Sequence, residues 1–220
     1  MEQTDIWSIN PSTSATFFKT AATVTGGTFP RALTLTNTDP VVAKEGAGYQ
    51  VIITSGADDS GITFTINGAI VGQLNSQGQV PMPALPEVIT GPDTTTATST
   101  YYYSRIDSIV ISGAATGTVA VGTTGDLALP RCRIKGFYVV GGAGAGSLKV
   151  NRFTWETTAG SPSTVAPTNV ESLLDITTPA GATLTQFLSL PGQGILTGQQ
   201  QNDYAVVDDT AITDYTLFCG

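Results

Sequence analysis

The sequence predicts an all-β protein with two β-sandwich or jelly-roll-like domains and an extended N-terminal arm. Threonine is abundant and its branched Cβ suits a pleated strand, while 25 Gly and 12 Pro are spread along the chain as turn residues. Short apolar runs alternate with polar residues and are bounded by turn signals, as in sandwiches. No stretch of about 12 residues carries an apolar stripe with the 3.6-residue period of a helix.

Residues 1–30 are predicted to form the arm, because isolated apolar residues stand there in polar surroundings. The candidate interface residues in this arm are Trp7, Ile9, Phe17 and Phe18. Two placements are open. These side chains either pack on their own domain or dock on a neighbouring subunit, where large aromatic side chains often carry much of the binding energy.

Residues 31–128 are predicted to form the first sandwich. The segment 62–66 (ITFTI) alternates strictly, so its apolar side chains are expected to point into a core. Asn67-Gly68 follows and is typical of a type I′ turn, because both central residues of that turn need positive φ. We therefore expect a hairpin that closes on residues 69–71. Prolines exclude a central strand across residues 80–87.

Residues 129–220 are predicted to form the second sandwich or jelly roll. Gly122–Asp126 and Pro130 mark the expected boundary, near residues 126–131. Short strands are expected at 134–140, 147–153, 173–176, 184–190, 195–196, 204–207 and 215–219. The glycine-rich segment 141–146 is expected to be a hairpin turn. It does not fit a dinucleotide loop, because no helix follows to hold a pyrophosphate.

Charge and hydropathy narrow the range of partners. Charged residues make up only 12% of the chain, and 17 acids against 9 bases give a net charge of −8. The bases are scattered, whereas a groove that follows phosphates needs clustered cations, so no nucleic-acid partner is expected. No basic-then-apolar leader opens the chain, and no apolar run is long enough to span a bilayer. We therefore expect a protein made in a cytosol that contacts other proteins rather than a membrane.

The sequence offers little reactive chemistry. It has no His, which removes Ser-His-Asp and Cys-His catalysis and His-ligated zinc. Asp58-Asp59 and Asp208-Asp209 lack the spacing of a calcium loop and are expected to be solvated turns. We predict no enzymatic activity, no metal and no cofactor.

Cys132 and Cys219 are the two cysteines, and they stand near the beginning and the end of the second predicted domain. The first and last strands of a compact domain are often neighbours. Two readings stay open: a pair of buried reduced thiols, or a single bridge formed after release from the cell. The separation of the two Cα atoms decides between them.

Several strand-and-turn motifs resemble a recurrent module of tailed-bacteriophage virion proteins. In the first half they are ADDSGITFTING (57–68), VITGPDTTTATST (88–100), IDSIVISG (106–113) and VAVGTT (119–124). In the second half they are LLDITTPA (173–180), LPGQGI (190–195) and the terminal TLFCG (216–220). The resemblance covers about residues 45–220 and implies assembly into a virion, often as symmetric oligomers. It brings no catalytic residues to this chain.

Within that family the expected role is capsid decoration, in which a cement protein stabilises the shell, as a homotrimer bound to the major capsid protein. The protein would then be located in the virion after synthesis in the host bacterial cytoplasm. A tail, adaptor or head-fibre component is the alternative, although the heptads and repeats of long fibres are absent from the sequence. A carbohydrate-binding β-sandwich is an alternative from another class.

Overall fold

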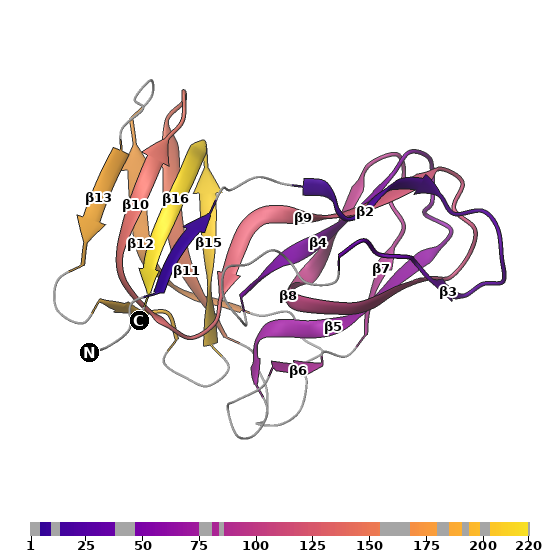
Figure 1. Ribbon diagram of the computed structural model, residues 1–220, viewed down its shortest axis with the longest axis horizontal. Helices are drawn as coiled ribbons and strands as arrows, with labels where there is room; N and C mark the ends of the chain where they lie inside the picture. Colours follow the sequence, from indigo (N-terminus) through magenta and orange to yellow (C-terminus); the bar gives the residue numbers. More distant parts are fainter. Residues whose placement is uncertain are drawn as a thin grey trace.

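The computed structural model describes residues 5–9, 14–37, 47–74, 81–83, 86–154, 168–179, 185–190, 194–198 and 203–219. All regular structure in these ranges is β-strand and no helix occurs in them, so the predicted fold class is confirmed. The molecule is elongated, with two lobes that lie side by side along its long axis (Figure 1). The lobe built from the described residues between 14 and 111 is called the N-terminal lobe, and the lobe built from those between 133 and 219 is called the C-terminal lobe.

The smaller sheet belongs to the C-terminal lobe. Its strands lie in the order β1-β16-β10-β13, and β14 also pairs with β10. All pairs in it are antiparallel. Its members are β1 (Asp5–Ile9), β10 (Arg133–Gly141), β13 (Thr185–Ser189), β14 (Ile195–Leu196) and β16 (Ile212–Cys219).

The larger sheet runs through both lobes in the order β12-β11-β15-β9-β4-β8-β5-β6, with β2, β3 and β7 paired to β9, β8 and β5. Its members in the N-terminal lobe are β2 (Ser14–Thr23), β3 (Arg31–Ala32), β4 (Gly48–Ser55), β5 (Thr63–Leu74), β6 (Pro81–Pro83), β7 (Glu87–Thr90), β8 (Thr96–Ile111) and β9 (Thr118–Leu129). In the C-terminal lobe they are β11 (Gly146–Thr154), β12 (Thr168–Thr178) and β15 (Asp203–Thr210). The three C-terminal strands face the smaller sheet across the second lobe (Figure 1).

Each lobe has its own apolar core. The first core gathers side chains from β2, β4, β5, β8 and β9, among them Phe18, Phe64 and Ile109. The second core gathers side chains from both sheets of the C-terminal lobe, among them Phe137 and Leu217. The alternation predicted for residues 62–66 is confirmed at Phe64, which is fully buried.

The N-terminal segment is paired with both lobes. β1 adds an edge strand to the smaller sheet, where Trp7 is paired in register with Leu217. β2 then pairs with β9 in the other lobe, with Lys19 opposite Val121. Residues 10–13, which connect these two strands, lie outside the described residues. The described part of the predicted arm therefore contributes one strand to each lobe.

The predicted hairpin at Asn67-Gly68 is wrong. β5 continues straight through both residues, and a β-bulge opposite β8 falls between them. The Asn67 side-chain amide donates a hydrogen bond to the Ser108 hydroxyl of β8 at 3.1 Å. A Cβ on Gly68 would overlap the backbone carbonyl of Arg105. Glycine is thus needed here for close approach of two strands, which is the other common role of glycine within a strand.

Two further segments differ from their local expectations. Gly122–Asp126, whose turn-like residues were used to place a boundary near 126–131, lies inside β9, which ends at Leu129. Glycine is required at 122 because its Cβ would overlap the backbone of β2 at Ser14. The segment 141–146 is not a hairpin turn, since β10 and β11 lie in different sheets and it crosses between them. The segment 161–167 (SPSTVAP), whose Ser and Pro residues predict a loop, lies outside the described residues.

Candidate functional site

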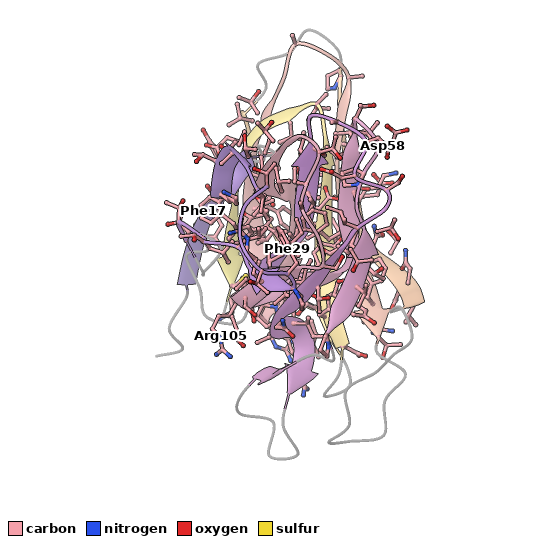
Figure 2. All side chains as sticks on the ribbon, turned by 90° about the vertical axis from the view of Figure 1, so that its right-hand side faces the viewer. Phe17, Phe29, Asp58 and Arg105 are labelled. Carbon is pink, nitrogen blue, oxygen red and sulfur yellow. The ribbon has the colours of Figure 1, made fainter. Side chains whose placement is uncertain are left out.

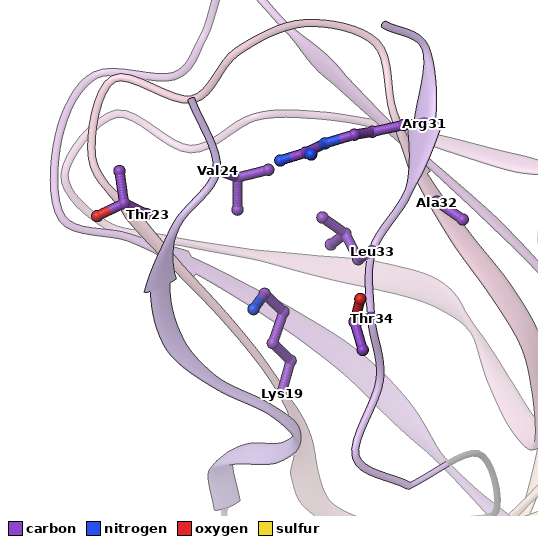
Figure 3. Close-up of a pocket in the computed structure, with 7 residues that line it drawn as sticks. All are labelled: Lys19, Thr23, Val24, Arg31, Ala32, Leu33 and Thr34. Carbon is purple, nitrogen blue, oxygen red and sulfur yellow. The ribbon is translucent and has the colours of Figure 1, made fainter. Parts of the chain in front are cut away.

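A pocket of about 180 Å³ opens in the N-terminal lobe between β2 and the segment that begins with β3. Figure 3 shows the Lys19 ammonium and the Arg31 guanidinium both directed into this space, from opposite sides. Its lining residues are Lys19, Thr23, Val24, Arg31, Ala32, Leu33 and Thr34.

The pocket has an apolar floor and a polar opening. Val24 and Leu33 are 4% and 7% exposed and belong to the first core, so they form the floor. Lys19 and Arg31 are half-buried, while Thr23 and Thr34 are exposed. A ligand in this space therefore meets two cations and two hydroxyl-bearing residues above a hydrophobic base.

Irregular pairing positions Lys19. The register between β2 and β9 shifts on both sides of the Lys19–Val121 pair, so Lys19 is flanked by two β-bulges or irregularities. Bulges change the direction in which a side chain projects from a sheet and are common beside functional sites. Next to it, the Phe18 carbonyl accepts a hydrogen bond from the Thr36 N–H at 2.7 Å. This bond holds β2 and the segment after β3 together at one end of the pocket.

Three local features hold Arg31. Its backbone pairs with Ile111 of β8. Its guanidinium lies over the ring of Phe29, 5.1 Å from the ring centroid, which is within the range of a cation–π interaction. Gly27 has φ of +101° and lies so close that a Cβ there would be 3.0 Å from Nη1 of Arg31. Figure 2 looks onto this end of the molecule, where Phe29 lies near the centre.

The two pocket cations differ in their partners from three other cations of the chain. Arg105 pairs with Asp107 at 2.8 Å, Lys149 with Asp175 at 3.8 Å and Arg152 with Glu171 at 2.9 Å. Within the described residues, neither Lys19 nor Arg31 has a carboxylate at salt-bridge distance. The chain has nine Lys and Arg against 17 Asp and Glu, and this pocket brings together two cations that lack an acidic partner among the described residues.

The four predicted interface residues are divided between the lobes. Phe18 is 1% exposed and lies in the first core, and Phe17 is partly buried against it, with the two rings edge to face at 5.0 Å. Trp7 and Ile9 lie on β1, at an edge of the smaller sheet, and their side chains are outside the described structure. Phe18 is therefore not accessible to a partner in this fold.

The first acidic pair is only partly the solvated turn that was predicted. Asp58 is exposed, and hydrogen bonds from Ser60 lower the pKa of its carboxyl. Asp59, in contrast, is 2% exposed. Its carboxylate accepts hydrogen bonds from the Ser55 hydroxyl and the Thr116 N–H, both at 2.6 Å. Asp59 is thus a buried structural residue that ties neighbouring loops together, because a buried carboxylate needs such donors.

A second group of carboxylates lies where the lobes join. Asp126 of β9 and Asp208 of β15 stand next to the paired residues Leu127 and Val207. Burial, together with the charges of Asp126 and Asp208, raises the pKa of Asp209 to about 7. Burial and the charge of Asp208 likewise raise the pKa of Asp126. Stability at this junction is therefore sensitive to pH.

Within the part of the chain that the structure describes, no group of three or more Cys, Asp or Glu is placed to hold a metal ion. The same residues include no helix with the length and hydropathy needed to cross a bilayer. No protein-family model, curated protein or solved structure matches the chain.

Lys19 and Arg31 were not singled out from the sequence, because each is an isolated cation 12 residues from the other. Lys19 follows the two aromatic residues of the predicted arm, and Arg31 opens a short apolar alternation. The separation in sequence gives no sign that β2 and β3 border one pocket. The one sequence signal that could have identified them is that Lys and Arg are rare in the N-terminal region, so each of them stands out there.

Proposed function

We propose that this chain is a structural component of a tailed-bacteriophage virion and acts as a capsid decoration protein. It binds the outside of the shell as a homotrimer and stabilises the shell against expansion and heat. The partner is the major capsid protein.

The observation that carries this proposal is the way the virion-like motifs assemble. The motif at 57–68 enters β5, the motif at 88–100 includes β7 and opens β8, and the motif at 106–113 completes β8. β5 pairs with both β7 and β8, so these separate segments form one continuous part of the larger sheet. The motifs that resemble virion proteins therefore lie on strands that pair with one another, as we expect of a module whose role is structural.

Exposed valines on edge strands support an assembling protein. Val88 is 61% exposed on β7, and Val170 is 50% exposed on β12. Among the described strands, β7 pairs only with β5 and β12 only with β11. An edge strand has unpaired N–H and C=O groups that can pair with another chain, and apolar side chains beside them add buried area. We assign these two edge strands to contacts between subunits of the oligomer or to contacts with the capsid shell.

The decisive experiment is imaging of intact particles by electron cryomicroscopy, with quantification of the chain by mass spectrometry. Hundreds of copies on the shell surface support decoration. A dozen or fewer copies at the portal or tail contradict decoration and favour the adaptor or tail alternative. Absence from the particle contradicts the virion assignment, and a glycan array then tests the carbohydrate-binding alternative.

A second experiment measures what the protein does for the particle. Particles made without this chain should release their DNA at a lower temperature than complete particles. Adding back purified protein should restore the difference, because a ligand that binds only the intact shell stabilises it by mass action. Equal release temperatures with and without bound protein would contradict a stabilising role.

A further inference from the structure

We propose that the pocket bordered by Lys19 and Arg31 binds a carboxylate on a short aliphatic stem, namely the side chain of a Glu or Asp of a partner protein. The proposal stands on the geometry of the pocket and does not depend on the virion assignment.

The first step is the charge of the pocket walls. Lys19 and Arg31 are both half-buried, and within the described residues neither has an acidic partner. Partial burial makes an unpaired cation costly, and a bound anion relieves that cost. The ring of Phe29 covers one face of the Arg31 guanidinium. The N–H donors along its edge stay directed into the pocket, where Figure 3 shows them.

The second step is the shape of the anion. A guanidinium presents parallel donors that match the two oxygens of a carboxylate, and an ammonium adds a point charge. The floor of Val24 and Leu33 is apolar, which suits methylene groups rather than a fully solvated phosphate. Two cations in one pocket also do not form the row that a nucleic-acid backbone requires. A carboxylate on one or two methylene groups can pair with the two cations of the walls, while its methylene groups contact the apolar floor.

The third step is access from a protein surface. Thr23, Ala32 and Thr34 border the pocket and are exposed, so a side chain can enter without rearrangement of the lobe. The pocket lies in the N-terminal lobe, between β2 and the segment that begins with β3 (Figure 1). An acidic residue on a partner can therefore reach it while the molecule stays intact.

The test uses the full chain, labelled with ¹⁵N, and titration with blocked amino acids followed by NMR. N-acetyl-glutamate methylamide should shift the amide signals of Val24, Leu33 and Thr34, with a Kd on the order of millimolar. N-acetyl-glutamine methylamide has the same shape without the charge and should bind at least tenfold more weakly. Inorganic phosphate should also bind more weakly than the glutamate probe. Equal affinity for the glutamine probe, or tighter binding of phosphate, would overturn the proposal.

Variants connect the binding to the two cations. Arg31→Gln and Lys19→Gln should each weaken binding of the glutamate probe at least fivefold. Arg105→Gln is the matched control, because it removes one positive charge from an exposed residue that does not line the pocket, and it should leave binding unchanged. If Arg31→Gln lowers the melting temperature through loss of the Phe29 contact, Lys19→Gln carries the test alone. Unchanged binding in Lys19→Gln, or equal weakening in Arg105→Gln, would refute the site.

Discussion

Replacing Phe18 with Ala tests whether the N-terminal segment is part of the fold or only a means of attachment. Phe18 is 1% exposed, so truncation removes a completely enclosed ring from the first core and its edge-to-face contact with Phe17. Phe-to-Ala changes at such sites lower the free energy of unfolding by about 3–5 kcal/mol. In a chain of this size each kcal/mol corresponds to about 2–4 °C, so we expect the melting temperature of the N-terminal lobe to fall by roughly 6–20 °C.

Phe17→Ala is the matched control, because Phe17 is a partly buried neighbour on the same strand. It should cost about 1–2 kcal/mol, since only part of its apolar surface is removed from water. The measurements are thermal and urea unfolding of the purified protein, followed by circular dichroism in the far and near ultraviolet, which give the melting temperature and the free energy of unfolding. If Phe18→Ala leaves the isolated protein as stable as the parent, Phe18 is not a core residue and the pairing of β2 described above is refuted.

Three further predictions concern other parts of the chain. Gly68→Val should destabilise the protein by about 2 kcal/mol or more, because the new side chain overlaps a carbonyl of β8. Gly61→Ala, at a position with open space, should change stability by no more than about 0.5 kcal/mol. The folded state holds the proton of Asp209 more tightly than the unfolded chain does. The free energy of unfolding should therefore fall as the pH rises from 3.8, the ordinary pKa of an Asp carboxyl, to about 7, the raised pKa of Asp209 in the folded state. Asp209→Asn should flatten this dependence in chemical denaturation at a series of pH values, and an unchanged slope would contradict it. Cys132 and Cys219 have buried Sγ atoms 3.7 Å apart, so oxidised glutathione should join them into one intramolecular disulfide, seen as a 2 Da loss in mass, and raise the free energy of unfolding by about 4 kcal/mol. Recovery of two reactive thiols after prolonged oxidation and unfolding would rule that reaction out.

The sequence predicted the fold class because its signals are local. Alternation in 62–66 and 147–153 reports directly which face of a strand is buried, and the structure places strands over both segments. The chain also lacks any segment with a helical period, and the described residues contain no helix. Period-two patterns depend only on neighbours along the chain, so no knowledge of the tertiary arrangement is needed to read them.

Glycine was the main source of error, because its two uses look alike in a sequence. Asn67-Gly68 has the composition of a tight turn, yet Gly68 serves the close approach of β5 to β8. Gly122 has the composition expected beside a domain boundary, yet it allows the backbone of β2 to approach its pairing partner β9 closely. Which use applies depends on whether another strand passes at that point, which is a long-range property. The pocket at Lys19 and Arg31 was missed for the same reason, since its walls meet only through the pairing of β2 and β3 with different strands.

The strand ladder that joins the lobes explains why residues 205–207 and 127–129 are apolar at every position rather than at alternate positions. Three consecutive residues of β15, from Ala205 to Val207, pair with Leu127 to Leu129 of β9. All six residues are 4% exposed or less. Because side chains alternate along a strand, Val206 points into the first core and Ala205 and Val207 point into the second.

This short ladder is therefore buried on both faces, as in the central strands of a parallel sheet, although here the pairing is antiparallel. Bending one lobe against the other would break hydrogen bonds that water cannot reach and would open two cores at once. Such a junction resists hinge motion far more than a linker of the same length. A change of the charged groups beside it, at Asp126 and Asp208, should consequently alter the stability of both lobes together.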